Sequence, residues 1–233
     1  ATPAEDRTFG CWTGDVPEDL REDNPLTLPM DRARTVSARF RDPKVHYVDY
    51  ANGVDSGDGT VMPWKTLAYA VSADSGVVEG DEIVLVKGTH VCSDNLVIDK
   101  KLHIHGAGDP SETVFDAEHK AKSTSNPHVK ITADGALINN LTFSRLCGGQ
   151  NHNCGLVTMS GASAISNVVF TASGNTDGGN NGKLVVLSKG ILTRCAITGN
   201  DMRYGPIVNI TGTGLMENCL VYDNRIATAN GGI

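Results

Sequence analysis

The stretch 135-GALINNLTFSRL-146 sets a pattern that returns three times further along the chain. The matching segments are GASAISNVVFTAS (161–173), GILTRCAITGN (190–200) and GLMENCLVYDN (214–224). One position of the pattern holds Leu141, Val168, Cys195 and Cys219. A second position, two residues later, holds Phe143, Phe170, Ile197 and Val221. Successive segments are thus 27, 27 and 24 residues apart, which indicates a structural repeat.

Each segment reads as a β-strand with one buried face, because its apolar residues alternate at period two. The alternation places a third set of residues, four before the first, on the same inner face: Leu137, Ala164, Ile191 and Leu215. A shorter strand precedes each segment, at 129–132, 156–160, 183–188 and 206–211. One such unit cannot bury its own apolar face, so the units must stack.

Stacked coils about 4.8 Å apart would bring equivalent residues of successive units directly above one another. The sequence therefore predicts an all-β fold, a right-handed parallel β-helix. The fixed leucine and asparagine pattern of leucine-rich repeats is missing. An antiparallel sandwich would not explain why inward residues agree at one repeat interval.

Earlier segments fit the same solenoid less regularly. The strand-like stretches are 81–91, 96–108 and 113–118, and we place Leu102 and Ile104 in the positions of Leu141 and Phe143. That alignment needs a long loop within 117–127. The stretch PWKTLAYAVSA (63–73) has helical spacing, with Pro63 as a favoured first helical residue, and predicts a helix that caps the solenoid.

The order of these features is similar to that of a known superfamily. The stretches YVDYANGVDSGDGTVMPWKTLAYAV (47–71), GDEIVLVKGTHV (80–91) and KKLHIHGAGDPSETVFDA (100–117) resemble the opening of pectate-lyase-like right-handed β-helix proteins. The resemblance covers about 45–233 and implies a strand, a Gly/Asp-rich loop, a Pro-led capping helix and the first coils in that order.

The N-terminal part does not join the repeat. FGCWTGDVPEDLREDNPLTLPMDRARTVSARF (9–40) resembles the closing half of a divergent internalin-type B-repeat, a small β module of bacterial surface and secreted proteins. We therefore expect a partial β module at 1–42 and the β-helix at 43–233. Both units look unfinished, so we also expect further domains of the same chain at both ends.

Charge and hydropathy exclude two classes of partner. Residues 1–120 hold 22 acidic and 12 basic side chains, and residues 121–233 hold 5 and 8. No cluster of Lys and Arg appears, which argues against a nucleic-acid partner. No apolar run approaches the roughly 18 residues of a membrane span, and the first ten residues lack the order of a signal peptide.

One group of residues is a candidate for catalysis. Asp201, Arg203, Asp223 and Arg225 follow equivalent strands of two adjacent coils. Enzymatic β-helices use carboxylates and basic residues to cleave acidic polysaccharides. The local sequences GNDMRYG and YDNRIAT match neither the paired aspartates of polygalacturonases nor the patterns of pectate lyases. Residues 121–233 contain only 5 carboxylates, which leaves few candidates for the pair that a two-carboxylate hydrolase needs.

Metal-binding candidates are weak. Asp49, Asp55 and Asp58 lie in a Gly-rich loop that offers oxygen ligands to Ca²⁺, but their spacing departs from the known calcium loop, and we expect a solvated turn and no cofactor. His103 and His105 alternate with apolar residues, so both face outward on one strand, where a metal could reach both. We interpret them as a surface pair.

Cys147 and Cys154 bracket the polar loop GGQNHN (148–153). We expect a short disulfide there if the compartment is oxidising. A zinc site made by Cys147, His152 and Cys154 is the alternative, although its fourth ligand is unassigned.

Two further pairs belong to the interior. Cys195 and Cys219 would lie about 4.8 Å apart, within disulfide range, but parallel stacking points both Cβ atoms the same way and favours buried free thiols. Asn200 and Asn224 fall at equivalent bends, where stacked asparagines can bond each other's amides along the coil axis.

These features favour a secreted or surface-displayed bacterial protein that binds an extracellular polysaccharide or a cell-surface glycan, as an adhesin or contact surface. The ending NCLVYDNRIATANGGI (218–233) also resembles repeats of autotransporter passenger domains. The alternative is a polysaccharide lyase or glycoside hydrolase. The fold alone does not separate them.

Overall fold

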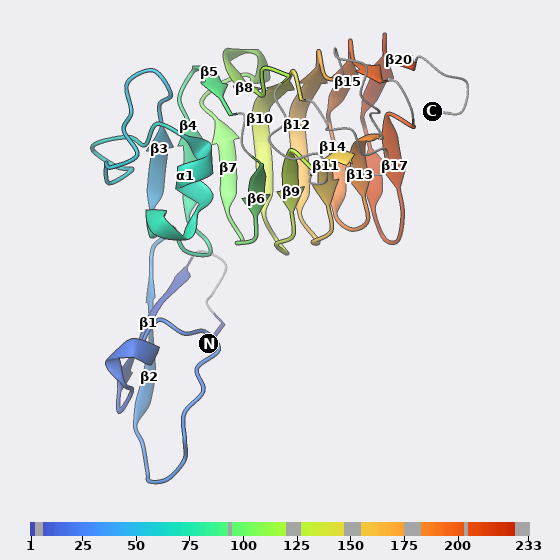
Figure 1. The fold of residues 1–233 in the computed structure, drawn as a ribbon. Coiled ribbons are helices and arrows are strands. Elements are labelled where there is room, and N and C mark those ends of the chain that lie inside the picture. Colours follow the sequence, from blue (N-terminus) through green and yellow to red (C-terminus); the bar gives the residue numbers. More distant parts are fainter. Residues whose placement is uncertain are drawn as a thin grey trace.

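The protein is a parallel β-helix with a two-stranded module at its N-terminal end (Figure 1). The computed structural model describes residues 1–2, 7–92, 95–119, 127–146, 155–174, 183–202 and 205–226. In the described part, no helix has the length and apolar character needed to cross a membrane.

The largest sheet has eleven strands, all paired in parallel. Its first arm is formed by β3 (Val45–Val48), β4 (Glu82–Leu85), β7 (His103–Gly106), β10 (Leu137–Ser144), β12 (Ala164–Thr171), β14 (Ile191–Thr193) and β18 (Leu215–Glu217). Its second arm pairs with the later halves of β10 and β12 and contains β5 (Gly88–Val91), β8 (Thr113–Asp116), β15 (Ala196–Thr198) and β19 (Leu220–Tyr222).

A five-stranded parallel sheet closes the solenoid on another side. It contains β6 (Leu96–Ile98), β9 (Val129–Ile131), β11 (Gly155–Met159), β13 (Lys183–Leu187) and β17 (Val208–Ile210). The short strands β16 (Asp201–Met202) and β20 (Arg225–Ile226) pair with each other. Two 3₁₀ turns, η2 (Ala73–Ser75) and η3 (Pro110–Glu112), connect elements of the early coils.

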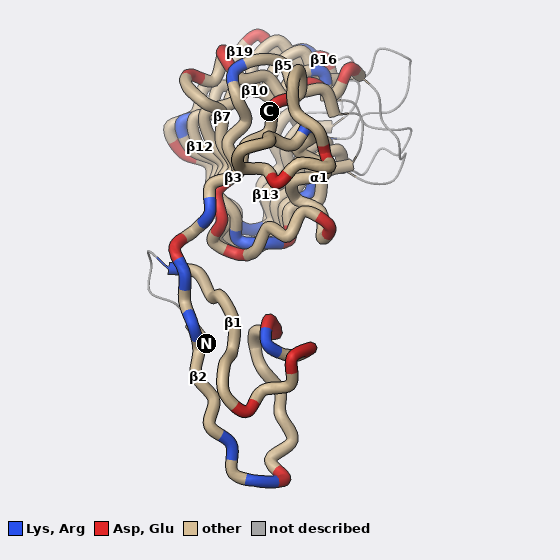
Figure 2. Tube along the Cα trace, turned by 90° about the vertical axis from the view of Figure 1, so that its left-hand side faces the viewer, with Lys and Arg blue, Asp and Glu red and all other residues tan. Residues whose placement is uncertain are grey.

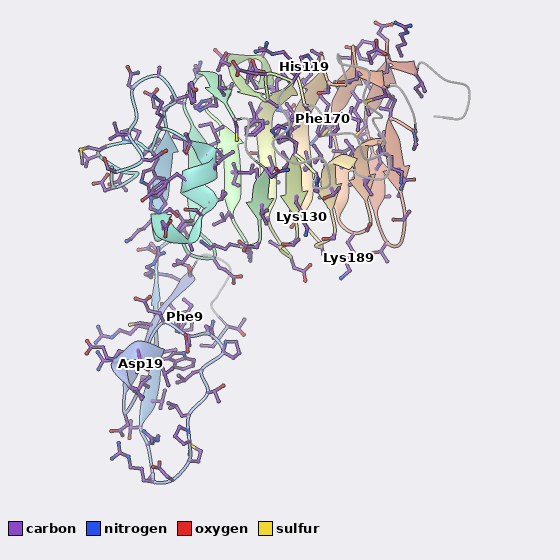
Figure 3. All side chains as sticks on the ribbon, in the orientation of Figure 1. Phe9, Asp19, His119, Lys130, Phe170 and Lys189 are labelled. Atoms are coloured by element: carbon purple, nitrogen blue, oxygen red, sulfur yellow. The ribbon has the colours of Figure 1, made fainter. Side chains whose placement is uncertain are left out.

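The predicted repeat spacing is confirmed by the strand register. Leu141 pairs with Val168, and Phe143 pairs with Phe170, which in turn pairs with Ile197. The side chains of the second position stack through the interior: the rings of Phe143 and Phe170 are 5.5 Å apart and nearly parallel. Phe170 is buried, whereas Lys130 on β9 and Lys189, which Figure 3 also labels, are exposed.

The prediction for Leu137 and its equivalents was wrong. These residues face outward, and the buried positions are one residue later, at Ile138, Ile165 and Leu192. The cause is a bend inside each long strand, where one residue adopts a left-handed conformation. The bend residues are Asn140, Asn167, Arg194 and Asn218, with φ of 52–55°. A residue in the left-handed conformation shifts the alternation of inward and outward side chains by one position. The inward residues before and after the bend are therefore three residues apart and not two.

The same bend explains a wrong alignment of the earlier coil. Leu102 and Ile104 do not occupy the positions of Leu141 and Phe143, because Ile104 pairs with Ile138 in the first arm. Phe115 of β8 is the residue that pairs with Phe143. The two arms of one coil come from separate strands here, and the sequence pattern alone did not separate them.

The capping helix is shorter than predicted. Helix α1 spans Leu67–Val71, and its N-cap is Thr66, whose hydroxyl accepts the Tyr69 N–H at 3.1 Å. Pro63 is therefore not a helical residue. The preceding Trp64 is buried and pairs with Val48 as an isolated bridge, which holds the chain extended before the helix begins.

Asparagine side chains satisfy the backbone at a second set of bends. Asn200 Oδ1 accepts the Ser173 N–H of the previous coil at 3.0 Å, and Asn200 Nδ2 donates to Phe170 O at 2.9 Å and to Asn224 Oδ1 at 2.9 Å. Ser173 does the same one coil earlier, where its hydroxyl accepts the Leu146 N–H at 3.1 Å. A short polar side chain that points inward thus accepts a hydrogen bond from a backbone N–H group that would otherwise have no partner at the bend.

Replacing Asn200 by alanine should lower the free energy of unfolding by about 1–3 kcal/mol, because buried backbone groups of Ser173 and Phe170 lose their partners. Urea unfolding followed by circular dichroism would measure this loss. Asn200→Ser should recover part of it, since Ser173 performs the same role at the equivalent position. Asn209→Ala on β17 is the control, with an expected change within about 0.5 kcal/mol. Equal losses for N200A and N209A would contradict the role of the ladder.

The N-terminal module is a two-stranded antiparallel sheet. Strand β1 (Thr8–Gly14) pairs with β2 (Val36–Arg41), with a bulge between Phe9 and Cys11, and the 3₁₀ turn η1 (Glu18–Leu20) follows β1. In Figure 1 the module projects from the N-terminal end of the solenoid. Its attachment includes Arg41, which donates to the buried Asp81 at 2.9 Å, and Thr8, whose hydroxyl donates to Glu79 O.

Candidate functional site

The outer surface of the first arm of the eleven-stranded sheet, from β4 to β18, is called the outer face below. One row of its side chains, in register from coil to coil, holds Glu82, His103, Leu137, Ala164, Ile191 and Leu215. The neighbouring row holds Val84, His105, Asn139, Ser166, Thr193 and Glu217. From β10 onward, an aliphatic row therefore runs beside a polar row.

The aliphatic row exists because of the strand bends. The inner face is already filled by Ile138 and its equivalents, so Leu137 and Ile191 stand on the outside, where each is half-buried. Leu215 at the last described coil is exposed. Aliphatic side chains in a line on an outer surface are a feature that often marks a contact site.

The polar row is held by hydrogen bonds to its neighbours. Arg194, at a strand bend, donates from Nη2 to Ser166 Oγ at 2.9 Å. Asn139 Oδ1 lies 3.2 Å from His103 Nε2 of the previous coil. These contacts fix the orientation of the side chains, so the row presents amide and hydroxyl groups at defined positions.

A cluster of metal-ligating side chains lies at the N-terminal end of the outer face. Glu82 on β4 is the register partner of His103 on β7, and His105 lies two residues further on the same face. His105 Nε2 is 2.7 Å from Glu82 Oε1, and the two imidazole rings stack at 4.6 Å. One ligand atom from each of the three residues lies within 4.8 Å of the others.

Both histidines therefore face outward, as the alternation predicted, but they are not an isolated surface pair. Glu82 was not recognised from the sequence. It precedes His103 by 21 residues, and only the parallel pairing of β4 with β7 brings the two together. The alternation of 81–91 would have placed Glu82 outward, so the missing information was the register.

The catalytic candidates are only partly brought together. Asp201 and Arg225 are register partners, and Arg225 Nη1 is 3.5 Å from Asp201 Oδ2 on an exposed edge. Asp223 lies at a bend with φ of 52°. Arg203 is outside the described residues. Asp201 and Arg225 form an exposed ion pair of the kind that contributes little to stability.

The aspartates of the Gly-rich loop are engaged in turns. Asp49 and Asp58 each accept backbone N–H groups two to four residues later, at 2.8–3.0 Å. Asp55 accepts the N–H groups of Lys65 and Thr66 at 2.9 Å and so supports the start of α1. These hydrogen bonds lower the pKa of Asp58, and the Asn52 side chain lowers that of Asp49.

The interior cysteines stack as free thiols. The Cys195 N–H lies 3.5 Å from Cys219 Sγ, and Cys195 Sγ donates to Thr193 O at 3.2 Å. Burial raises the pKa of the Cys195 thiol to about 12, so this group is not a nucleophile at neutral pH. The predicted Cys147–Cys154 disulfide and the zinc alternative with His152 lie outside the described residues.

An ion pair that sequence reasoning missed joins two coils at the end of the second arm. Arg145 donates from Nε to Asp116 Oδ1 at 2.7 Å, and its Nη2 donates to the other carboxylate oxygen. Burial would raise the pKa of Asp116, but the hydrogen bonds from Arg145 and the Glu118 N–H outweigh it and lower that pKa. The two charges neutralise each other, so the pair holds the coils together.

Charges are interspersed around the coils and the module, as Figure 2 shows for Lys, Arg, Asp and Glu. Among the described residues of the outer face, carboxylates stand at its two ends, Glu82 on β4 and Glu217 on β18. Five strand spacings separate them, which is about 24 Å. The pair of carboxylates that cleaves a glycosidic bond lies roughly 5–9.5 Å apart.

Comparison with known proteins adds little on function. No protein-family model and no curated protein matches the sequence. Among solved structures, a rhamnogalacturonan lyase aligns with a TM-score of 0.38 and 14% sequence identity, over 81% of this chain and 60% of that chain. The present chain thus spans 60% of the lyase's length. A similarity this low carries no argument about activity, and the assignment of a β-helix rests on the strand pairing.

Proposed function

We propose that the outer face binds a polysaccharide lengthwise, and that the protein acts as an extracellular or bacterial surface-displayed contact module. The observation that carries this proposal is the pair of parallel rows from β10 to β18, one aliphatic and one polar. Both rows repeat with the coil spacing of about 4.8 Å. A ligand that is itself a repeating chain would meet the same pair of contacts on every coil.

The chemistry of the rows suits a sugar chain. Sugar hydroxyls both donate and accept hydrogen bonds, and Asn139 and Thr193 offer an amide and a hydroxyl group that do the same. Ser166 is buried, and the Arg194 guanidinium that donates to it offers further N–H donors at this place in the row. The C–H faces of sugar rings gain from contact with aliphatic side chains such as Leu137 and Ile191. Between β10 and β14 the residues of the two rows are uncharged, and the Arg194 guanidinium lies against Ser166 of the polar row.

The proposed location rests on the N-terminal module. Residues 9–40 resemble the closing half of an internalin-type B-repeat by their sequence, and such modules occur in bacterial surface and secreted proteins. Among the residues that the structure describes, the dispersed charges give no basic face for nucleic acid. A surface role with a glycan partner therefore agrees with both parts of the chain.

The alternative is a polysaccharide lyase or glycoside hydrolase. It needs an acid and a base, or a nucleophile, at a short distance on one strand face. The described outer face instead separates its two carboxylates by about 24 Å. This separation argues against hydrolysis by a carboxylate pair on the described outer face, and the assay for unsaturated products tests the lyase directly.

The test is affinity electrophoresis of the full chain through gels that contain neutral and acidic polysaccharides, with products assayed for new reducing ends and unsaturated sugars. We expect retention by at least one of these polysaccharides. Asn139→Ala/Thr193→Ala should bind it at least tenfold more weakly, because two polar contacts are removed. Thr158→Ala/Asn209→Ala on the outside of the five-stranded sheet should bind normally.

Two results would overturn the proposal. Wild-type protein that no polysaccharide of a broad panel retains would remove the binding function. New reducing ends or unsaturated products would replace it with the enzymatic alternative. Circular dichroism of each variant verifies that the β-helix is intact.

A further inference from the structure

We propose that Glu82, His103 and His105 form a binding site for a divalent transition metal of the zinc class. The inference concerns β4 and β7, at the N-terminal end of the two rows, and shares only Asn139 with the polysaccharide surface that begins at β10. It rests on the placement of the three side chains, on the hydrogen bonds of His105, and on the access of solvent to the cluster.

The backbone places the three residues on two neighbouring strands of the same parallel sheet. Glu82 and His103 are register partners in β4 and β7, so their Cα atoms are about 4.8 Å apart. His105 projects from the same face two residues later. Between them Ile104 is buried in the core, which fixes the strand and therefore the direction of both imidazoles.

The hydrogen bonds of His105 point to a cation. His105 Nδ1 lies 3.1 Å from Gly106 O, and because a carbonyl only accepts, Nδ1 carries a proton. In a neutral imidazole Nε2 then bears a lone pair, and this lone pair faces Glu82 Oε1 at 2.7 Å. The 2.7 Å separation is that of a hydrogen bond, so a proton lies between the two atoms, and a metal ion would replace this proton and take both atoms as ligands.

The arrangement around His105 is also what a metal-ligating histidine requires. Such a histidine usually donates its other ring N–H to a carbonyl or carboxylate, which fixes the tautomer and the ring orientation. Gly106 O provides this contact for His105. For His103, Asn139 lies 3.2 Å from Nε2 and can fix that ring in the same way, leaving Nδ1 as the ligand atom.

The donor set selects the metal. Two imidazoles and one carboxylate suit Zn²⁺, Ni²⁺ and Cu²⁺, whereas Ca²⁺ takes six to eight oxygens. Bonds of about 2.1 Å around a tetrahedral ion place ligand atoms roughly 3.4 Å apart. The present ligand atoms lie within 4.8 Å of one another, so side-chain rotations of about 1 Å would close the site. A water molecule can supply the fourth ligand.

Solvent reaches the cluster. The side chain of Glu82 is 33% exposed and that of His105 is 19% exposed, so a hydrated ion can approach without opening the fold. The simpler interpretation is an ion pair between Glu82 and a doubly protonated His105. The two interpretations differ in one measurable property, which is the affinity for added metal.

The experiment is isothermal titration calorimetry of ZnCl₂ into the full chain after treatment with EDTA, in the absence of any polysaccharide. We expect one ion per chain. His105→Ala, His103→Ala and Glu82→Gln should each weaken binding by at least tenfold. Thr193→Ala, on the same face three strands away, should bind Zn²⁺ as the wild type does.

The cysteine loop supplies the decisive control. Cys147→Ser/Cys154→Ser should leave Zn²⁺ binding unchanged. Loss of binding in this variant with full binding in His105→Ala would overturn the proposal, and so would a wild-type chain that binds no Zn²⁺. As a second measurement, substoichiometric Cu²⁺ should broaden the NMR signals of the His103 and His105 rings before those of the buried His90 and His128. Broadening of other histidines first would also overturn it.

Discussion

Replacing Phe143 by alanine is expected to lower the free energy of unfolding by about 3–5 kcal/mol, the usual cost of truncating a buried phenylalanine. Phe143 is 2% exposed and contacts a ring on each side along the coil axis. The Phe115 ring lies 5.3 Å away at 74°, and the Phe170 ring lies 5.5 Å away at 26°. The cavity would open in the middle of this stack, where the neighbouring coils restrict collapse.

Urea unfolding followed by circular dichroism measures the effect. Tyr222→Ala is the matched control, since this aromatic side chain belongs to the same sheet but is 50% exposed. It should change the stability by less than about 1 kcal/mol. A loss of similar size in the two variants would show that Phe143 is not part of a close-packed core.

Replacing Asp81 by alanine should cost a similar amount, about 3–5 kcal/mol, because the partly buried Arg41 and the N–H groups of Lys44 and Val78 all lose their acceptor. The Asp81 side chain is fully buried and accepts from Arg41 at 2.9 Å, from the Lys44 N–H at 2.9 Å and from the Val78 N–H at 3.1 Å. These contacts join the N-terminal module to the first coil. Asp42→Asn, which removes only an exposed ion pair with Arg7, should cost less than about 1 kcal/mol.

The Asp81 contribution should also depend on pH. Burial would raise the pKa of Asp81, but the His46 imidazole 3.6 Å away and the hydrogen bonds from Arg41 and the backbone outweigh it and hold that pKa well below its usual value. A depressed pKa in the folded state stabilises the protein above the unfolded-state pKa of about 3.9, and this stabilisation is lost as the pH falls below that value.

The difference in unfolding free energy between wild type and Asp81→Asn should therefore be constant between pH 5 and 7 and should shrink toward pH 3. Urea unfolding of both proteins at each pH measures this difference. The contributions of the other carboxylates to the pH dependence are nearly the same in both proteins and therefore cancel when the two values are subtracted. A difference that grows on acidification would contradict the assigned sign.

The proposed polysaccharide surface depends on a feature that sequence reasoning had reversed. Leu137 and Ile191 were predicted to fill the core, and had they done so the outer face would have no aliphatic row. The left-handed residues at Asn140 and Arg194 place them outside. Asparagine tolerates this conformation better than most residues, yet Arg194 shows that the stacked neighbours can impose it on others.

The β-helix and the register of its later coils could be predicted from the amino-acid sequence, because equivalent core positions recur at 27, 27 and 24 residues and must stack to be buried. The alternation also placed His103 and His105 on the outside. The bend of each strand, and the order in which the strands of the irregular early coils pair, became visible in the folded chain alone. Glu82 joins the histidines, and Arg145 joins Asp116, through such pairings. Parallel pairing joins residues separated by a whole coil, and where coil lengths vary, no local pattern encodes that distance.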